Sequence, residues 1–463
     1  MNFHNKVLQM REEIIKSTQE IVRIKSVEDA PKEGMPFGEG VHSCLEYALA
    51  LSEKLGFTTK NFNGYAGHAE FGEGEEVVGI LVHLDVVPEG DNWTYPPYGG
   101  EIHDGKIYAR GTIDDKGPAI AGLYAMKAVK DSGMPLNKKI RIIFGTDEES
   151  GWDDMKYYLE NQKAPDVAFT PDAEFPAIYG EKGILIFDFV KTLHKNSPES
   201  GIVIHKIKGG NRPNMVPDYC EAHISSNPSI LEKLTAFLKE NHLKIEAEVT
   251  GDKTILKSYG ISAHGSLPES GQNAVSQLVL FLNTLDLADG DAADFIHFYS
   301  NKIGMEYYGQ SMGCGFYDEV SGKLIFNVGV IDLNEDEIKL TINIRYPVTY
   351  TTNVVYDAME KELEGTGIKL IRGKHDMDPI YLPKDHELIK KLMQVYTKIT
   401  GDDREPITMG GGTYARAMKN AVAFGPLFPG QPELAHQKDE YISVEDLLKI
   451  TEIYAEALYE LAK

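Results

Sequence analysis

The chain has 463 residues, 42% of them hydrophobic, and its 71 acidic side chains outnumber the 47 basic ones to give a formal charge of −24. This length exceeds one ordinary hydrophobic core and predicts two domains, while the charge argues against nucleic acid or an anionic membrane as a partner. The three cysteines are too widely spaced for a thiolate zinc site. The sequence has no signal-peptide core and no apolar segment of the ~20 residues that span a bilayer. We therefore expect a cytoplasmic protein.

Strands and helices alternate in the first part of the chain. Apolar residues recur at helical spacing over residues 5–23 and 42–55. The run VGILV at 78–82 contains no charged residue, as expected for a strand buried on both faces. The elements predicted after it are a hairpin turn at 104–105, a helix at 118–129, a strand at 139–144, a helix at 152–159 and a strand at 167–169. This alternation predicts an α/β domain with a mostly parallel sheet covered by helices.

The pattern changes after about residue 177. The elements predicted there are strands at 184–190, 202–207, 253–259, 324–331 and 339–344, with helices near 230–240, 273–285 and 353–364. Strand–helix–strand units occur twice, which predicts an inserted α+β domain made of two related halves. A helix from about 385, a strand at 422–424 and a helix at 444–461 then resemble the first domain again. The predicted division is a catalytic domain at 1–177 and 383–463, interrupted by the inserted domain at 178–382.

Acidic and imidazole side chains gather where the predicted strands end. His83 and Asp85 follow strand 78–82 and point the same way, so the carboxylate can orient the ring and leave its other nitrogen for a metal ion. The other clusters are DDKG at 114–117, TDEES at 146–150, PDAE at 171–174 and AHQ at 435–437. Burying so much negative charge requires a compensating cation. Two imidazoles and several carboxylates form the ligand set of two hydrolytic metal ions, with adjacent Glu148 and Glu149 available as general base and ligand.

Each cluster taken alone has an ordinary structural explanation. A single histidine at a strand end is more often a satisfied polar residue, and DDKG is more often a helix N-terminus that favours carboxylates. A Glu-Glu pair is nearly always solvated, and an aspartate after proline commonly marks only a turn. The recurrence of four clusters after consecutive strands is what favours a metal site.

The same segments resemble a known enzyme family. The motifs are HLDVVP at 83–88, ARGTIDDKGP at 109–118, TDEESG at 146–151, PDAEFP at 171–176 and AHQKDEY at 435–441. Together, in this order and over nearly the whole chain, they are similar to metallopeptidase family twenty, which includes glutamate carboxypeptidase, aminoacylase and succinyl-diaminopimelate desuccinylase. Within that family the strongest resemblance is to the bacterial PepV-type dipeptidases, through GISAHGSLPESGQNA at 260–274, NIRYP at 343–347 and MGGGTYAR at 409–416.

The resemblance implies a role for each residue of the metal site. It implies that Asp114 bridges two divalent ions, with zinc favoured and manganese or cobalt as alternatives. The ligands implied for the two ions are His83 with Asp172, and Glu149 with His436. Glu148 is implied as the general base that activates a metal-bridging water, and Asp85 as the carboxylate that orients His83. The Asp114–Asp115 peptide bond is cis in similar proteins.

Substrate contacts are implied in and near the inserted domain. His264, otherwise an ordinary loop histidine, resembles the residue that stabilises the oxyanion when this domain closes as a lid. Arg345, otherwise a surface cation, resembles the residue that binds the substrate carboxylate in a bidentate manner, with Asn214 nearby. Gly411, Gly412 and Thr413 are either a simple helix-entry loop or a set of backbone N–H groups that bind the same carboxylate.

The function implied is hydrolysis of the peptide bond of dipeptides, with β-Ala-Xaa among the substrates. Two alternatives remain open at this stage: an N-acyl amino acid deacylase or desuccinylase, and a binding protein without activity on the same scaffold. PepV-type lids are enlarged to imitate a partner's lid, so the doubled pattern of the insertion predicts a monomer whose partner is a small peptide, with no nucleic acid and no membrane.

Overall fold

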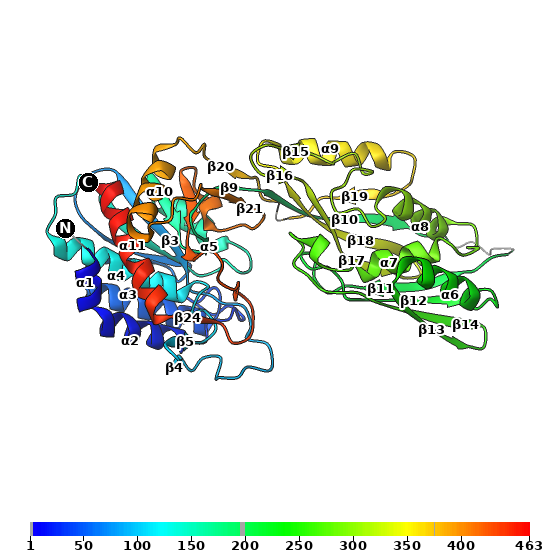
Figure 1. Cartoon of the computed structure of the whole chain (residues 1–463), viewed down its shortest axis with the longest axis horizontal. Helices are drawn as coiled ribbons and strands as arrows, with labels where there is room; N and C mark the ends of the chain where they lie inside the picture. Colours follow the sequence, from blue (N-terminus) through cyan, green and yellow to red (C-terminus); the bar gives the residue numbers. More distant parts are fainter. Residues whose placement is uncertain (1–2, 195–199, 375) are drawn as a thin grey trace. The chain divides into compact units, whose positions relative to one another are not determined.

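The computed structural model describes residues 3–194, 200–374 and 376–463, which divide into two compact units. Unit 1 contains Met1–Gly180, Leu382–Thr408 and Gly412–Lys463, and unit 2 contains Glu181–Tyr381 with Met409–Gly411. Unit 1 holds the blue, cyan, orange and red elements of Figure 1, and unit 2 the green and yellow ones. The domain boundaries expected at residues 177 and 382 stay a prediction, and they lie close to these breaks.

The sheet of unit 1 has parallel strands at its centre and antiparallel strands at both edges. It runs in the order β1 (Thr58–Phe62), β2 (Ala66–Phe71), β6 (Lys139–Gly145), β3 (Val77–His83), β7 (Val167–Thr170), β22 (Ala421–Phe424) and β9 (Ala177–Glu181). β3 pairs in parallel with both β6 and β7, and all seven of its residues are buried. The prediction of a mostly parallel α/β sheet is confirmed at this centre. The sequence did not predict β1 and β2, because TTKNF in β1 has a single buried residue and no apolar run.

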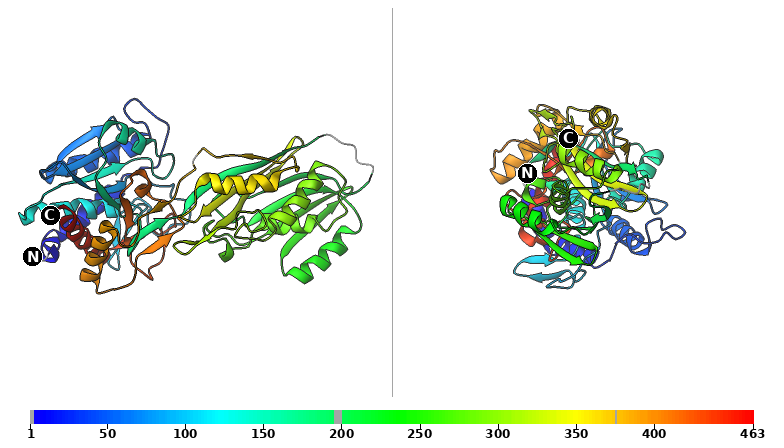
Figure 2. Two further views of the ribbon diagram at one scale, coloured as in Figure 1. Left: turned by 90° about the horizontal axis from the view of Figure 1, so that it is seen from above. Right: turned by 90° about the vertical axis from the view of Figure 1, so that its right-hand side faces the viewer.

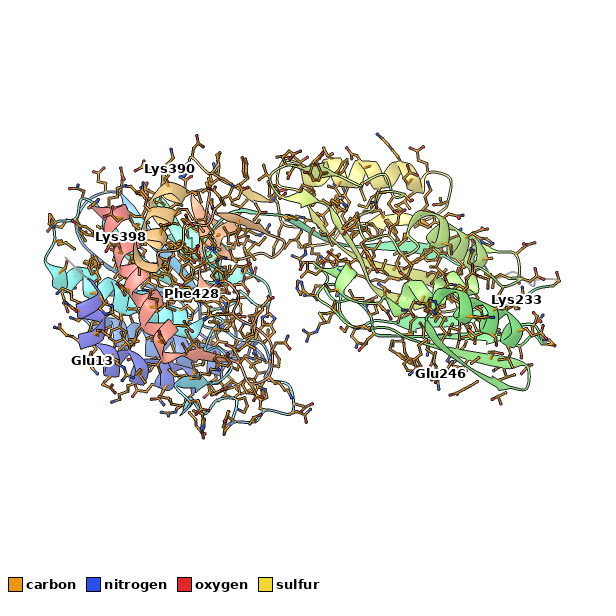
Figure 3. The ribbon with its side chains drawn as sticks, in the orientation of Figure 1. Glu13, Lys233, Glu246, Lys390, Lys398 and Phe428 are labelled. Carbon is orange, nitrogen blue, oxygen red and sulfur yellow. The ribbon has the colours of Figure 1, made fainter. Side chains whose placement is uncertain are left out.

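Helices cover this sheet. They are α1 (Phe3–Gln9), α2 (Arg11–Val22), α3 (Glu39–Lys54), α4 (Lys116–Ser132), α5 (Asp153–Asn161), α10 (Glu387–Thr400) and α11 (Val444–Ala462). The helix predicted at 5–23 is two helices with a break at Met10. α4 and α11 pack on each other and on β3 and β6, whereas α3 and α5 contact β1 and β2. α1 and α11, at the two ends of the chain, lie side by side in Figures 1 and 2. Lys398, labelled on α10 in Figure 3, forms an ion pair with Glu456 of α11.

Several short elements accompany the large sheet. They are the small sheet of β24 (Tyr441–Ser443), β5 (Lys106–Tyr108) and β4 (Glu101–His103), the pair β8 (Ala173–Glu174) and β23 (Pro426–Leu427), and the 3-10 helix η2 (Tyr414–Ala417), while β20 (Ile380–Tyr381) and β21 (Ile407–Met409) pair with β9 in the large sheet itself. The predicted hairpin turn joins β4 to β5, with φ of 48° at Asp104 and 74° at Gly105. Two positive φ angles match a type I′ turn, which explains the Asp-Gly pair.

Unit 2 is an α+β unit, as predicted, and it is built on one antiparallel sheet. The strand order is β13 (Lys244–Thr250), β14 (Lys253–Tyr259), β12 (Tyr219–Ser225), β11 (Ile204–Gly209), β17 (Ile325–Leu333), β18 (Glu337–Tyr346), β10 (Gly183–Thr192) and β19 (Lys369–Ile371). The other elements are α6 (Ile230–Asn241), η1 (Pro268–Ser270), α7 (Ala274–Leu282), α8 (Asp291–Lys302), α9 (Thr352–Leu363), and the hairpin of β15 (Tyr317–Asp318) and β16 (Gly322–Lys323). The two predicted strand–helix–strand patterns therefore share a single sheet. In the part of the chain that the structure describes, no helix is long and apolar enough to cross a membrane.

Candidate metal centre

His83 is the last residue of β3 and lies at the carboxyl end of the parallel sheet, where α/β folds place their ligands. Only 1% of its side chain is exposed. Its Nδ1 lies 3.0 Å from the backbone carbonyl oxygen of Asp85 and 3.5 Å from the Asp85 carboxylate. The carbonyl is therefore the nearer partner of the ring, and the interaction leaves Nε2 available to a ligand.

The Asp85 carboxylate instead holds the turn that carries the paired glutamates. Oδ1 accepts the backbone N–H of Glu148 at 3.2 Å, and Oδ2 accepts that of Glu149 at 3.0 Å. The resemblance implied that Asp85 orients His83, and the geometry adds this second task. A charged acceptor for two N–H groups fixes the turn more strongly than a neutral acceptor does.

Asp114 faces both predicted histidine ligands. Its Oδ1 lies 2.9 Å from Nε2 of His83, and its Oδ2 lies 3.1 Å from Nε2 of His436. Asp115, joined to it by a cis peptide bond, turns the other way and accepts the backbone N–H of His83 at 3.1 Å. Asp114 is therefore the member of the pair that is placed to bridge two ions. Among the described residues, Oδ1 of Asp115 has no hydrogen-bonding partner.

The remaining predicted ligands converge on the same place. Oε1 of Glu149 lies 3.1 Å from Nε2 of His436, and Oδ1 of Asp172 lies 3.9 Å from Nε2 of His83. Two triads have ligand atoms within 4.8 Å of one another: His83, Asp114 and Glu149, and His83, Glu148 and Asp172. The structure thus brings together all five predicted ligands and Glu148, although they come from five separate segments of the chain.

The pKa values of the site reflect burial and the crowding of carboxylates. Burial lowers the pKa of His83, but its contacts with Asp114 and Asp172 raise it well above the ordinary value. Burial also lowers the pKa of His436, whose ring is half exposed. Its contacts with Asp114 and Glu149 outweigh this effect and raise the pKa to about 11. Burial, followed by the charge of Asp114, raises the pKa of Glu149 to about 7. The carboxylates that crowd the two imidazoles thus raise the pKa of both rings.

The residue set fits divalent metal ions. Four carboxylates, those of Asp114, Glu148, Glu149 and Asp172, face only two imidazoles, so the cluster carries a deficit of positive charge. Burial and the charge of Asp172 hold the pKa of Glu148 well above its usual range, as expected for a site that lacks its counter-charge. Nitrogen and oxygen ligands of this kind accept zinc, manganese or cobalt. An ion placed between the imidazoles and the carboxylates would replace the protons that they now share.

Three further residues that the sequence reasoning missed support the glutamate turn. Asp154, at the start of α5, accepts the backbone N–H groups of Thr146 at 2.6 Å and Asp147 at 3.2 Å through Oδ2. The same oxygen accepts a hydrogen bond from the hydroxyl of buried Tyr414. The Trp152 indole donates to the carbonyl of Glu148 at 2.8 Å. The turn is therefore held on several sides, and WDD after TDEESG is the sequence signal that could have indicated it.

The substrate-binding residues predicted in unit 2 form two separate sets of hydrogen bonds, one around Arg345 and one around His264. Arg345 is 6% exposed and donates from Nη1 to the carbonyl of Gly410 at 3.1 Å and from Nε to Asn343 at 3.2 Å. His264 is exposed, with Nδ1 2.6 Å from Oγ of Ser266, and the backbone carbonyl of Asn214 accepts the N–H of Gly265, the residue after His264. The roles of Arg345, His264 and Asn214 toward a substrate stay predictions.

The loop at 410–413 leads into a shorter helix than a carboxylate-binding helix terminus requires. η2 has four residues, and the Thr413 hydroxyl accepts the N–H of Ala415 at 3.2 Å. The Thr413 side chain thus occupies a position that a bound anion would take. Substrate binding by Gly411, Gly412 and Thr413 stays a prediction.

Comparisons with known proteins agree with this arrangement. Residues 79–460 match the family described as "Peptidase family M20/M25/M40". The chain is 44% identical over 468 residues to the "Putative dipeptidase YtjP" of Bacillus subtilis (strain 168), with 100% of both chains covered. Two solved structures have the same fold. The structure of human carnosine dipeptidase 1 has a TM-score of 0.60 and 16% identity, with 99% of this chain and 98% of that chain covered. The structure of the di-peptidase Dug1p from Saccharomyces cerevisiae has a TM-score of 0.59 and 13% identity, with 99% of this chain and 97% of that chain covered. The family predicted from the motifs is confirmed: the chain belongs to peptidase family M20/M25/M40 and is a hydrolase of peptide bonds.

Proposed function

We propose that the protein is a dipeptidase that depends on two divalent metal ions and hydrolyses Xaa-Xaa dipeptides, β-Ala-Xaa included. One observation carries the proposal: the two oxygens of the Asp114 carboxylate face two different imidazoles, at 2.9 Å for His83 and 3.1 Å for His436. A carboxylate shared in this way suits a pair of ions rather than a single one. His83 and Asp172 would complete one ion's ligands, and Glu149 and His436 the other's.

Two such ions supply an acidified water molecule and a polarised scissile carbonyl. The protein's own contribution to proton transfer comes from Glu148, whose carboxyl belongs to the triad with His83 and Asp172. Its backbone is fixed on both sides, by Asp85 at the N–H and by Trp152 at the carbonyl. We assign to Glu148 the removal of a proton from the attacking water and its return to the leaving amine.

The choice of substrate rests on the relatives. The Bacillus subtilis relative and the two solved structures are each named as dipeptidases, which supports a short peptide over an N-acyl amino acid. The 44% identity over the whole chain gives the first of these the most weight. The oligomeric state predicted from the enlarged insertion, a monomer, stays a prediction.

The test begins with protein stripped of metal by a chelator and reloaded with zinc, manganese or cobalt alone. Each form is assayed by chromatography against a panel of free-amine dipeptides, including some that begin with β-alanine, and against N-acetyl amino acids. We expect two bound ions per chain and hydrolysis of dipeptides only. Glu148→Gln should keep both ions and lower kcat roughly 10²- to 10⁴-fold, because it keeps the shape and removes the base.

Glu76→Gln is the matched control. Glu76 precedes β3 at the end of the strand opposite His83, is 58% exposed and pairs with Lys138, so its substitution should leave kcat unchanged. Hydrolysis of N-acetyl amino acids without any dipeptide cleavage would identify a deacylase. Less than one ion per chain, together with no hydrolysis, would indicate a binding protein on the same scaffold.

A further inference from the structure

A buried ion pair joins two motifs that the catalytic scheme leaves without a role. Arg110, in ARGTIDDKG, and Glu440, in AHQKDEY, are separated by 330 residues, yet Nη1 of Arg110 lies 2.6 Å from Oε2 of Glu440. Their side chains are 2% and 0% exposed. Neither residue belongs to the two ligand triads, so the pair is a structure next to the metal centre rather than part of it.

Glu440 holds the segment that carries the bridging carboxylate. Its Oε1 accepts the backbone N–H of Ile113 at 2.9 Å and that of Asp114 at 3.3 Å. The Asp114 side chain is thus directed from a backbone that Glu440 anchors. The backbone carbonyl of Glu440 also accepts the N–H of Ala109 at 3.1 Å, which continues the pairing between β24 and β5.

Arg110 holds the segment that carries His436. The same Nη1 donates to the carbonyl of Gln437, the next residue, at 3.2 Å. His436 has φ of 62°, a left-handed conformation that a non-glycine residue keeps only where its surroundings hold it. Asp439, with φ of 57°, is held as well, by the backbone N–H and hydroxyl of Thr94. The loop that delivers His436 is therefore strained and tied down at Gln437 and Asp439.

A buried ion pair is a poor choice for stability alone. Removing two charges from water offsets most of their attraction, so a pair of packed apolar side chains is often as stable or more so. Glu440 adds a further negative charge close to the carboxylates of the metal centre. What the pair supplies and apolar side chains do not is a set of directed hydrogen bonds to both segments.

We infer that Arg110 and Glu440 are positioning residues that fix the His436 loop against the Asp114 loop, and so set the geometry of the ion that His436 binds. The inference rests on the proposed dinuclear site. The other ion shares Asp114 with this one, but its remaining ligands, His83 and Asp172, lie at and just after the ends of β3 and β7, away from the pair. Disturbing the pair should therefore weaken the ion that His436 binds more than the other.

The test substitutes Glu440→Gln in the full chain. The side-chain carbonyl oxygen of the glutamine can still accept the backbone N–H of Ile113. Its NH₂ group then faces the guanidinium of Arg110, so two hydrogen-bond donors meet and the hydrogen bond from Arg110 to Gln437 is weakened. Zinc is titrated into the metal-free protein in competition with a chromophoric chelator. We expect the zinc site that His436→Ala abolishes to lose 10- to 100-fold in affinity, as for other supporting residues of metal sites, and the other site to lose less. In dipeptide hydrolysis kcat should fall while KM stays the same.

Glu70→Gln is the matched control. Glu70 pairs with Arg141 at 2.6 Å, and Arg141 also donates to a backbone carbonyl, that of Lys163, so the chemistry is the same in another part of unit 1. This variant should lower the melting temperature and leave both zinc affinities unaltered. In a His436→Ala background, Glu440→Gln should have no further effect on zinc binding, because the residue through which it acts is gone.

Three outcomes would overturn the inference: Glu440→Gln with both affinities unchanged, a loss shared equally by the two sites, or a full additional loss in the His436→Ala background. If Glu440→Gln does not fold, Arg110→Lys replaces it with the same criteria, since lysine lacks the guanidinium geometry. Wild-type protein that binds fewer than two zinc ions would instead refute the dinuclear site, so the two failures are distinct.

Discussion

Asp85→Asn separates the two tasks that the structure gives to this residue. The substitution keeps the backbone carbonyl that lies 3.0 Å from Nδ1 of His83, so the imidazole should keep its orientation. It changes the acceptor of two N–H groups, those of Glu148 at 3.2 Å and Glu149 at 3.0 Å, from a carboxylate to an amide. The side-chain oxygen of the asparagine can take the place of one carboxylate oxygen and accept one of these backbone N–H groups. Its NH₂ group then faces the other backbone N–H, and neither of these two donors has an acceptor.

The size of the effect follows from these two hydrogen bonds. Asp85 is 1% exposed, so water does not replace a lost acceptor. A hydrogen bond to a charged group contributes about 1.5–3 kcal/mol and a neutral one about 1 kcal/mol, so the turn loses roughly 2–4 kcal/mol of support. If the turn relaxes by moving Glu148 away from the attacking water, the loss appears as a fall in kcat of roughly 30- to 1000-fold.

The assay measures kcat and KM for a dipeptide together with zinc binding. We expect a lower kcat, a nearly constant KM because buried Asp85 does not reach the substrate, and full retention of the ion bound by His83. Asp166→Asn is the control, since Asp166 accepts the N–H of Val77 at the other end of β3 at 2.8 Å. An unchanged kcat, or selective loss of the His83 ion, would show that orientation of His83 is the dominant task after all.

Three further predictions concern protons and metal. Burial lowers the pKa of His436, but Asp114 and Glu149 raise it to about 11, and the pKa of His83 is raised as well, so zinc loading at pH 7 should release protons and strengthen as pH rises, measured by calorimetry in two buffers. Burial and the charge of Arg141 lower the pKa of His68 to about 4, so its contribution to stability is full above pH 6.5 and falls by about 3 kcal/mol towards pH 4, measured by urea unfolding. Chelation of bound metal should lower the melting temperature, because ligands stabilise the folded state by mass action.

Each of these has a result that contradicts it. Zinc binding without proton release would mean that the imidazoles of the metal-free protein are neutral. A His68→Gln variant whose unfolding free energy keeps the same acid dependence as the wild type would remove His68 as its source. A melting temperature that is insensitive to chelator would argue that the carboxylates of the centre need no metal counter-charge.

The sequence by itself determined the central strand and marked the segments that carry the candidate ligands. The apolar run at 78–82 predicts a buried strand whichever elements lie beside it, because burial on both faces leaves no place for charge. The resemblance of their motifs to a known peptidase family is what singled out His83, Asp114, Glu149, Asp172 and His436, and a motif is a local property of the sequence. The hairpin at Asp104-Gly105 was predicted for the same reason, since a type I′ turn depends on only two residues.

The tertiary structure decided which of these residues meet and what supports them. Nothing local distinguishes Asp114 from Asp115; the direction of each carboxylate follows from contacts with His83 and with His436, which is 322 residues further along the chain than Asp114. The pairing of Arg110 with Glu440 was invisible for the same reason, because a buried arginine looks like a surface cation until its partner is placed beside it. A candidate metal ligand can be recognised in a sequence by its residue type. The residues that hold a ligand in place are defined only by their proximity to it, and this proximity arises only when the chain folds.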